Sequence, residues 1–402
     1  MSASLPAPTL VTDQAGLAAM LEVLESARVI GVDTEADAFF SYHQKVCLVQ
    51  VTAGEQDWII DPLADLDLGP MGPMLADPER VKVFHDAEFD ILLLGRSHGF
   101  RLAGLFDTRV AAAVLGSSNP GLANVLEARF GVTLDKSMQR SDWSKRPLSD
   151  KQLDYARMDT RLLPRLYEEL LAECTERGRL EIVESECRRL EALEPADEAA
   201  VHPDAFVKIK GARELDPVGR AVLRELFLMR DEAARAADRP PFRVLGNGTL
   251  IELARRRPRS TRELTAIKGF TPRVASKLGA RTQEAIQRGL EAEPLKRLPD
   301  APRKEGAVDM DEATQELHER LKRWRKEAAE KLGLESAYLV NRHLLARLAL
   351  ERPSDEAALA ATEGIQPWQL RDHGAPILGV VRQFVEDEAA GRLPKKRRSW
   401  RR

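Results

Sequence analysis

The sequence has few cysteines and no long apolar segment. Its three cysteines, Cys47, Cys174 and Cys187, are scattered along 402 residues. None belongs to a Cys-x-x-Cys pair, so neither zinc binding nor thiol redox chemistry is predicted. No apolar run approaches the roughly 18 residues of a membrane-spanning helix, and residues 1–8 lack a basic region followed by an apolar core. We therefore expect a cytoplasmic protein without a membrane segment.

Charge is unevenly distributed along the chain, although the net charge is only -3. Residues 1–194 carry 20 Lys and Arg against 32 Asp and Glu, whereas residues 195–402 carry 41 against 32. An acidic half can bind cations and a basic half can hold a polyanion. The asymmetry therefore favours an enzyme that acts on nucleic acid, and the alternative is two unrelated solvated surfaces.

The most informative stretch is an apolar run, Val29 to Val32, that leads into Asp33, Thr34 and Glu35. In a strand, alternate side chains share a face, so both carboxylates would point the same way. Two like charges at this spacing favour a divalent cation between them, with Mg²⁺ or Mn²⁺ as the hard ions that oxygen ligands prefer. The alternative is a polar turn after the strand.

Periodicity predicts an α/β domain for the acidic half. Strands are expected at 29–32, 45–52, 57–60 and 81–84, with a short fifth strand at 105–106. The first three would form a meander. Helices are expected at 13–26, after Asp90 through about Arg96, and at 108–115, 122–130 and 149–177.

The last of these helices carries a pair of polar side chains on one face. Ser149 and Gln152 form a capping-box pattern at its start. Tyr155 and Asp159 are four residues apart, so they share a face. Such a pair is common on helix surfaces and indicates little by itself.

The basic half contains an internal repeat. A shift of 95 residues aligns it with itself without a gap, which predicts two copies of one small helical domain. The aligned positions include Arg230 with Arg325, Leu250 with Leu345, Arg257–Pro258 with Arg352–Pro353, and Gly269 with Gly364.

The first copy and the C-terminal tail are rich in positive charge. We expect a phosphate-binding surface there, and the alternative is a solvated helical face. The candidate nucleic-acid-binding residues are Arg255, Arg256, Arg257, Lys268, Arg273 and Lys277, with Lys395, Lys396, Arg397 and Arg398 in the tail.

Four acids and a tyrosine in this order resemble the tyrosine-containing branch of the DEDD superfamily of 3′-to-5′ exonucleases, and more narrowly the ribonuclease D family. The matching motifs are Asp33-Thr34-Glu35, residues 85–90 and residues 155–159. Residues 42–50, 60–63, 107–108, 132–137 and 142–148 are also similar. The repeated unit resembles the HRDC domain that RecQ-type helicases share with ribonuclease D.

The resemblance implies a ribonuclease H-like exonuclease domain, with a mixed five-stranded sheet and helices, followed by two all-α HRDC bundles. It also implies two divalent metal ions, Mg²⁺ or Mn²⁺. Asp33 would bridge them, Glu35 and Asp159 would hold the ion that binds the attacking water, and Asp90 would serve the second ion. Tyr155 would orient that water. Its phenol has a reference pKa of about 10, so orienting the water is easier for it than acting as a general base.

His85 is either a phosphate contact or a structural histidine at the end of a strand. One position departs from the family: the residue after Glu35 is commonly phenylalanine and here is Ala36. Phe39 and Phe40 follow and could supply the same apolar contact.

The expected function is a metal-dependent 3′-to-5′ exoribonuclease that releases nucleoside 5′-monophosphates. Its expected substrate is RNA with a free 3′ end, above all transfer RNA precursors, and we expect a monomer. A DNA exonuclease and a nucleic-acid-binding protein without activity are the alternatives. The expected division is a catalytic domain at 1–194, HRDC domains at 213–291 and 310–390, linkers at 195–212 and 292–309, and a basic tail at 391–402.

Overall fold

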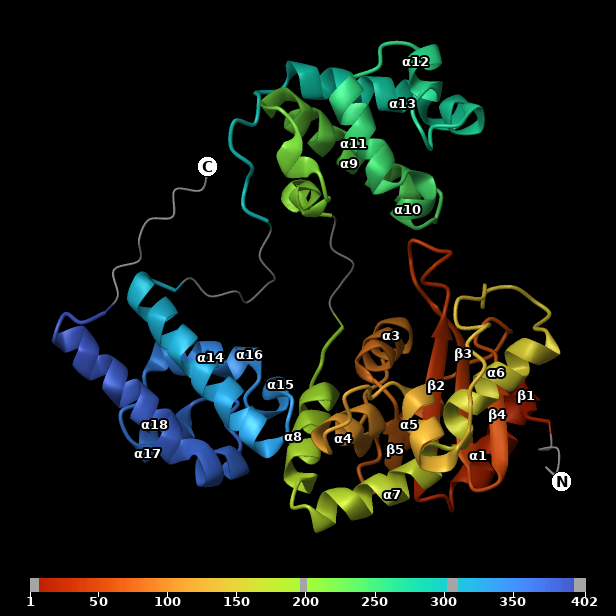
Figure 1. Cartoon of the computed structure of the whole chain (residues 1–402). Helices are drawn as coiled ribbons and strands as arrows, with labels where there is room; N and C mark the ends of the chain where they lie inside the picture. The colour runs from red at the N-terminus through yellow and green to blue at the C-terminus, as the bar shows by residue number, and fades with distance from the viewer. Residues whose placement is uncertain (1–6, 196–200, 302–309, 394–402) are drawn as a thin grey trace.

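The structure, a computed structural model, describes residues 7–195, 201–301 and 310–393. Its N-terminal domain is built on a six-stranded sheet in the order β1-β4-β3-β2-β5-β6 (Figure 1). The strands are β1 Thr9–Val11, β2 Val29–Ala36, β3 Val46–Ala53, β4 Gln56–Ile60, β5 Val81–Phe84 and β6 Leu105–Asp107. The predicted antiparallel meander is β2-β3-β4, and β5 and β6 extend it in parallel from β2. The sequence predicts five of the six strands. The additional strand is β1, whose three residues are too few to show a periodic pattern.

Strand β2 is central in the sheet and carries the two acids within its length. It continues through Ala36, so Asp33 and Glu35 lie in the strand and the alternative of a polar turn is wrong. Gly31 is on the same face, where a Cβ atom would lie 2.9 Å from the carbonyl oxygen of Thr160. The absent side chain therefore lets a helix approach the strand closely at this point.

Eight helices surround the sheet in the described part of this domain. They are α1 Gln14–Leu24, α2 Met71–Ala76, α3 Glu88–His98, α4 Thr108–Val114, α5 Leu122–Phe130, α6 Asp150–Arg161, α7 Leu163–Glu176 and α8 Leu180–Glu191. The single helix predicted at 149–177 is in fact two, which meet at Leu162. Pro164 explains the break, because it lacks the N–H that would continue α6 and is readily accommodated in the first turn of α7. The capping box of Ser149 and Gln152 is present as predicted.

The basic half forms two similar helical units, as the repeat predicts. The first contains α9 Pro217–Ala236, α10 Pro241–Val244, α11 Asn247–Arg256, α12 Thr261–Thr265 and α13 Pro272–Glu291. The second contains α14 Glu312–Leu332, α15 Ser336–Leu339, α16 Arg342–Glu351, α17 Glu356–Ala361 and α18 Pro367–Ala389. Equivalent residues of the two units also share a backbone conformation. Arg257 and Arg352, which are 95 positions apart, both have positive φ, 51° and 49°.

Packing of the first unit begins before α9. Two 3₁₀ helices, η1 Pro203–Lys208 and η2 Ala212–Glu214, precede it. Phe206 of η1 is fully buried in the hydrophobic core of this unit, inside the stretch expected to be a linker.

The second unit packs against α8 of the catalytic domain (Figure 1). The indole Nε1 of Trp368 donates to Ser185 Oγ at 3.0 Å, and Arg371 pairs with Glu181 at 2.8 Å. The buried apolar residues of this unit and of the catalytic domain form one continuous cluster. No helix within the described ranges combines the length and apolar character needed to cross a lipid bilayer.

The first unit instead contacts the loop of residues 37–45 between β2 and β3, whose tip lies at α10 in Figure 1. The backbone N–H groups of Tyr42 and His43 donate to Asp238 Oδ1 at 2.9 and 3.0 Å. The Tyr42 hydroxyl donates to the Asp231 carboxylate at 3.0 Å, and the Arg243 guanidinium lies 4.0 Å from the centre of the Phe40 ring.

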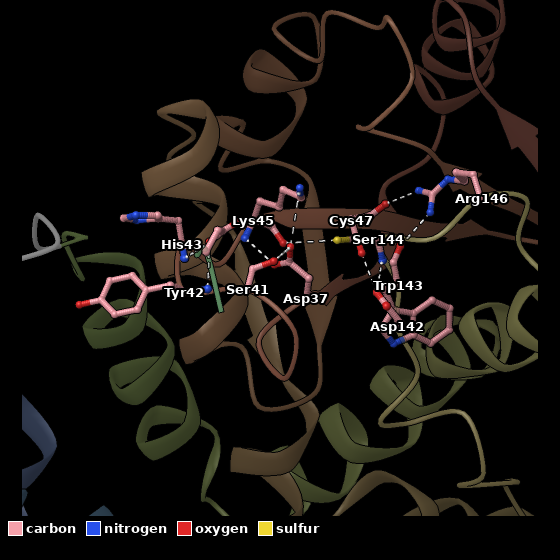
Figure 2. Close-up of polar contacts among 11 residues, drawn as sticks. Asp37, Ser41, Tyr42, His43, Lys45, Cys47, Asp142, Trp143, Ser144 and Arg146 are labelled. Atoms are coloured by element: carbon pink, nitrogen blue, oxygen red, sulfur yellow. Dashed lines mark hydrogen bonds and ion pairs between the residues drawn. The ribbon is translucent and has the colours of Figure 1, made fainter. Parts of the chain in front are cut away.

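Buried Asp37 holds the two ends of this loop together (Figure 2). Its carboxylate accepts from Ser41 Oγ at 2.6 Å and from the backbone N–H of Lys45 at 3.0 Å. The loop that directly follows the two acids of β2 is thus closed by Asp37 on the inside and contacted by the first helical unit on the outside.

Candidate active site

Three carboxylates from two elements meet at one point. Asp33 and Glu35 come from β2 and Asp159 from α6, and each offers an oxygen within 4.8 Å of the others. Helix α6 is fixed over the sheet by a hydrogen bond of 2.8 Å between Thr160 Oγ1 and Thr52 Oγ1 of β3. A set of three carboxylate oxygens at this spacing has the donor chemistry of a divalent-cation site.

Asp90 lies beside this group, in the first turn of α3. Its buried carboxylate accepts a short hydrogen bond from Thr34 Oγ1 and is not one of the three mutually close carboxylates. The turn before α3 is held by Asp107, which accepts from the backbone N–H groups of Asp86 and Ala87 at 3.1 and 2.8 Å. Asp86 has a positive φ of 71°, so this turn needs such support.

All four acids have raised pKa values because burial disfavours their charged forms. The pKa of Asp33 lies well above its ordinary value, first through burial and then through Asp90 and Asp159. Burial and the neighbouring acids raise the pKa of Glu35 to about 9, and burial raises those of Asp90 and Asp159 to about 7. The cluster is therefore costly to ionise by itself, and bound cations would offset that cost.

Tyr155 points into the same site from α6. It hydrogen-bonds to Asp159, and burial followed by the nearby carboxylates raises its pKa well above the ordinary value. The phenol is therefore protonated at neutral pH. Its ring lies beside Trp143, with the centroids 5.9 Å apart.

Arg146 anchors the segment that carries Trp143. Its guanidinium donates to both carboxylate oxygens of Asp61, at 2.5 and 2.6 Å, and to the Cys47 carbonyl at 2.9 Å. Figure 2 shows Arg146 and Trp143 beside Cys47 of β3. This anchoring supports the side of the site against which Tyr155 rests.

The three acids and Tyr155 line a pocket of about 380 Å³. No role was predicted for several other lining residues, among them Arg109, Asn124, Lys136 and Gln139. Lys136 falls in one of the segments similar to the family, but no local pattern gave it a role. Arg109 pairs with Asp86 at 3.5 Å.

His85 also lines this pocket, as a neutral side chain. Its Nδ1 lies 2.9 Å from Thr108 Oγ1, and burial lowers its pKa to about 4. At neutral pH it therefore brings no positive charge to a phosphate, and its Nε2 is buried without a hydrogen-bond partner among the described residues.

A second pocket, of about 410 Å³, lies on the other side of Glu35. Ala36 is in its wall, and Phe39 and Phe89 line it with rings that are 44% and 47% exposed. Phe40 contacts Arg243 of the first helical unit instead. The aromatic surface expected from two neighbouring phenylalanines is thus supplied by Phe39 and Phe89.

The basic residues predicted to bind nucleic acid fall into two groups. Arg255 and Arg256 both pair with Glu252, and Arg257 pairs with Asp216. Lys268, Arg273 and Lys277 are exposed and form no ion pair with any residue that the structure describes. Lys395, Lys396, Arg397 and Arg398 lie outside the described residues.

The sequence matches two known families along most of its length. Residues 8–175 match the 3′-5′ exonuclease family, and residues 219–286 and 314–381 each match the HRDC domain. Fold, site and matches together define a nuclease of the 3′-to-5′ exonuclease class that carries two HRDC domains.

Relatives that cover two thirds or more of the chain narrow the class further. Ribonuclease D of Pseudomonas paraeruginosa is 34% identical over 277 residues, which is 67% of this chain and 71% of that protein. Ribonuclease D of Xanthomonas oryzae is 32% identical over 353 residues, which is 88% of this chain and 94% of that protein. The chain belongs to the ribonuclease D family, and it is a hydrolytic 3′-to-5′ exoribonuclease.

Solved structures agree with this assignment. The crystal structure of Escherichia coli RNase D, an exoribonuclease involved in structured RNA processing, superposes with a TM-score of 0.64 at 25% identity and covers 94% of this chain and 99% of its own. The catalytic core of RRP6 from Trypanosoma brucei gives 0.66 at 28% identity, covering 72% and 81%.

Proposed function

We propose that this exoribonuclease is metal-dependent, uses two Mg²⁺ or Mn²⁺ ions and releases nucleoside 5′-monophosphates. The observation that carries the proposal is the meeting of Asp33, Glu35 and Asp159, with Asp90 beside them, in a pocket with Tyr155. A binding protein without activity has no use for four acids gathered at one point, where their ionisation is unfavourable.

In this proposal the acids hold the ions and Tyr155 orients the water. Asp33 would be a ligand of both ions, Glu35 and Asp159 would hold the ion on the water side, and Asp90 would serve the other. Bound divalent ions supply an activated water and stabilise the leaving oxygen. Because its pKa is raised, Tyr155 acts as a hydrogen-bonding group and not as a base.

We propose that the substrates are transfer RNA precursors and other structured RNAs with free 3′ ends. The support is the E. coli relative, which is involved in structured RNA processing. The pocket beside Glu35 offers exposed rings on which a base can stack. The exposed cations Lys268, Arg273 and Lys277 would bind phosphates, together with the tail residues 395–398 and with Arg255, Arg256 and Arg257 once their ion pairs open. His85 would be a neutral contact.

We also propose a cytoplasmic monomer with the domain division expected above, with the first HRDC domain extended to include Phe206. The support for the extension is the burial of Phe206 in the core of that domain.

The test is degradation of a 3′-extended RNA, and of DNA of the same sequence, by the purified protein with Mg²⁺. Asp159→Asn should lose activity by a factor of about 10³ or more, because a missing ligand leaves one ion poorly held. Asp150→Asn, the same change at an exposed position of the same helix, is the matched control and should retain activity. Full activity of Asp159→Asn would refute the metal-site assignment, and equal rates on DNA would favour a DNA exonuclease.

A further inference from the structure

Gln50 is a buried polar residue whose side chain finds no hydrogen-bond partner in the part of the chain that the structure describes. It lies in β3, is 0% exposed, and neither its Oε1 nor its Nε2 has a partner among the described residues. A buried amide with both ends unpaired is destabilising, and native proteins rarely retain one without a reason.

The position of Gln50 points to the acidic cluster. In the antiparallel pairing of β2 and β3, Gln50 stands directly opposite Asp33. Directly opposed residues share a face, with Cβ atoms about 5 Å apart. The same face is covered by α6, because Thr52, two residues along β3, hydrogen-bonds to Thr160.

The strand neighbours of Gln50 do not satisfy its amide. On the β4 side Gln50 pairs with Ile59, which packs in an apolar cluster with Trp143 and Ala156. Thr52 Oγ1 is already engaged by Asp57 and Thr160, both at 2.8 Å. Asp33 is the polar side chain that the strand register places directly opposite Gln50.

We propose that Gln50 is a positioning residue for the ion-binding carboxylates: when Asp33 is ionised and holds a cation, the Gln50 side-chain N–H donates to the carboxylate oxygen that faces away from the ion. Ligand carboxylates generally need such an outer partner to fix their orientation. The proposal rests on the metal site of the proposed function and adds a residue that is not itself a ligand.

The test is Gln50→Met, which keeps the length of the side chain and removes both polar atoms. In EDTA the variant should melt at a higher temperature than the wild type, because the unpaired amide is gone. Its affinity for Mn²⁺, measured on the full chain by isothermal titration calorimetry or by electron paramagnetic resonance of free Mn²⁺, should fall about 10-fold or more. These two effects have opposite signs, which a simple packing role would not produce.

Thr282→Val is the control at a buried site away from the acids. Thr282 of α13 is 0% exposed and its Oγ1 also has no partner among the described residues, so the change should raise the melting temperature in EDTA and leave Mn²⁺ affinity unchanged.

Mn²⁺ affinity of Gln50→Met within about two-fold of the wild type would overturn the proposal. If that variant does not fold, Gln50→Ala takes its place in the same titration and is judged in the same way. Failure of the wild type itself to bind Mn²⁺ would overturn the metal site as a whole. That outcome is distinguishable from a wild type that binds Mn²⁺ and a variant that binds it equally well.

Discussion

We predict that the four clustered acids make the stability of the protein in EDTA depend on pH. Burial raises the pKa values of Asp90 and Asp159 from 3.8 to about 7. The folded protein therefore binds these protons more tightly than the unfolded chain does. Its free energy of unfolding is highest where both states are protonated, and it falls as pH rises from about 4 to about 7.

The size of the effect follows from the shift. Each pKa unit corresponds to about 1.36 kcal/mol, so one group shifted by about three units contributes at most about 4 kcal/mol. Roughly half of this, about 2 kcal/mol, falls between pH 5 and pH 7. For a domain of this size that corresponds to a decrease in melting temperature of about 4–8 °C for one group.

The assay is thermal unfolding in EDTA at pH 5, 6 and 7, repeated with saturating Mg²⁺. Mg²⁺ should remove most of the decrease, because the cation replaces the protons and stabilises the ionised cluster. In Asp159→Asn one titrating group is missing, so the decrease in EDTA should be smaller. A melting temperature that is constant or rises between pH 5 and pH 7 in the wild type, or an identical decrease in the variant, would refute the reasoning.

Three further predictions concern Tyr155, the contact between the first HRDC domain and the loop of residues 37–45, and the basic surface. Tyr155→Phe should lower kcat by a factor of about 10²–10³ with Mn²⁺ affinity unchanged, because one positioned hydrogen-bonding group is lost. A large loss of affinity in a calorimetric titration would contradict its role in orienting water. Asp238→Gly is compatible with the positive φ at this position but removes the acceptor for the loop of residues 37–45. Amide hydrogen exchange in that loop should therefore accelerate. Asp238→Asn retains an acceptor oxygen and should leave the exchange slow. Replacing Lys268 and Lys277 together by alanine should reduce the slope of log affinity for single-stranded RNA against log salt concentration by about 1.4. Arg257→Ala breaks an existing ion pair and should reduce this slope less.

The pattern of the sequence determined those parts of the protein that depend on neighbouring residues. Alternation in β2 placed Asp33 and Glu35 on one face, and four-residue spacing placed Tyr155 and Asp159 on another. The repeat of 95 residues predicted two similar helical units, and the equivalent residues Arg257 and Arg352 of these units both have positive φ. The family resemblance joined these pieces into one site. The break at Pro164 is equally local, and the prediction of one long helix overlooked it.

Only the tertiary structure decided which distant side chains meet. Gln50 faces Asp33 because of the register between two strands, and Lys136 and Gln139 reach the pocket from a segment without a periodic pattern. His85 is neutral because burial lowers its pKa, and the charge composition of the sequence gives no information about burial. Asp238 contacts Tyr42 in the loop after β2, although the two residues are 196 positions apart in the sequence. Periodicity reports the direction of a side chain within its own element, whereas register, burial and domain contact are set by packing between elements.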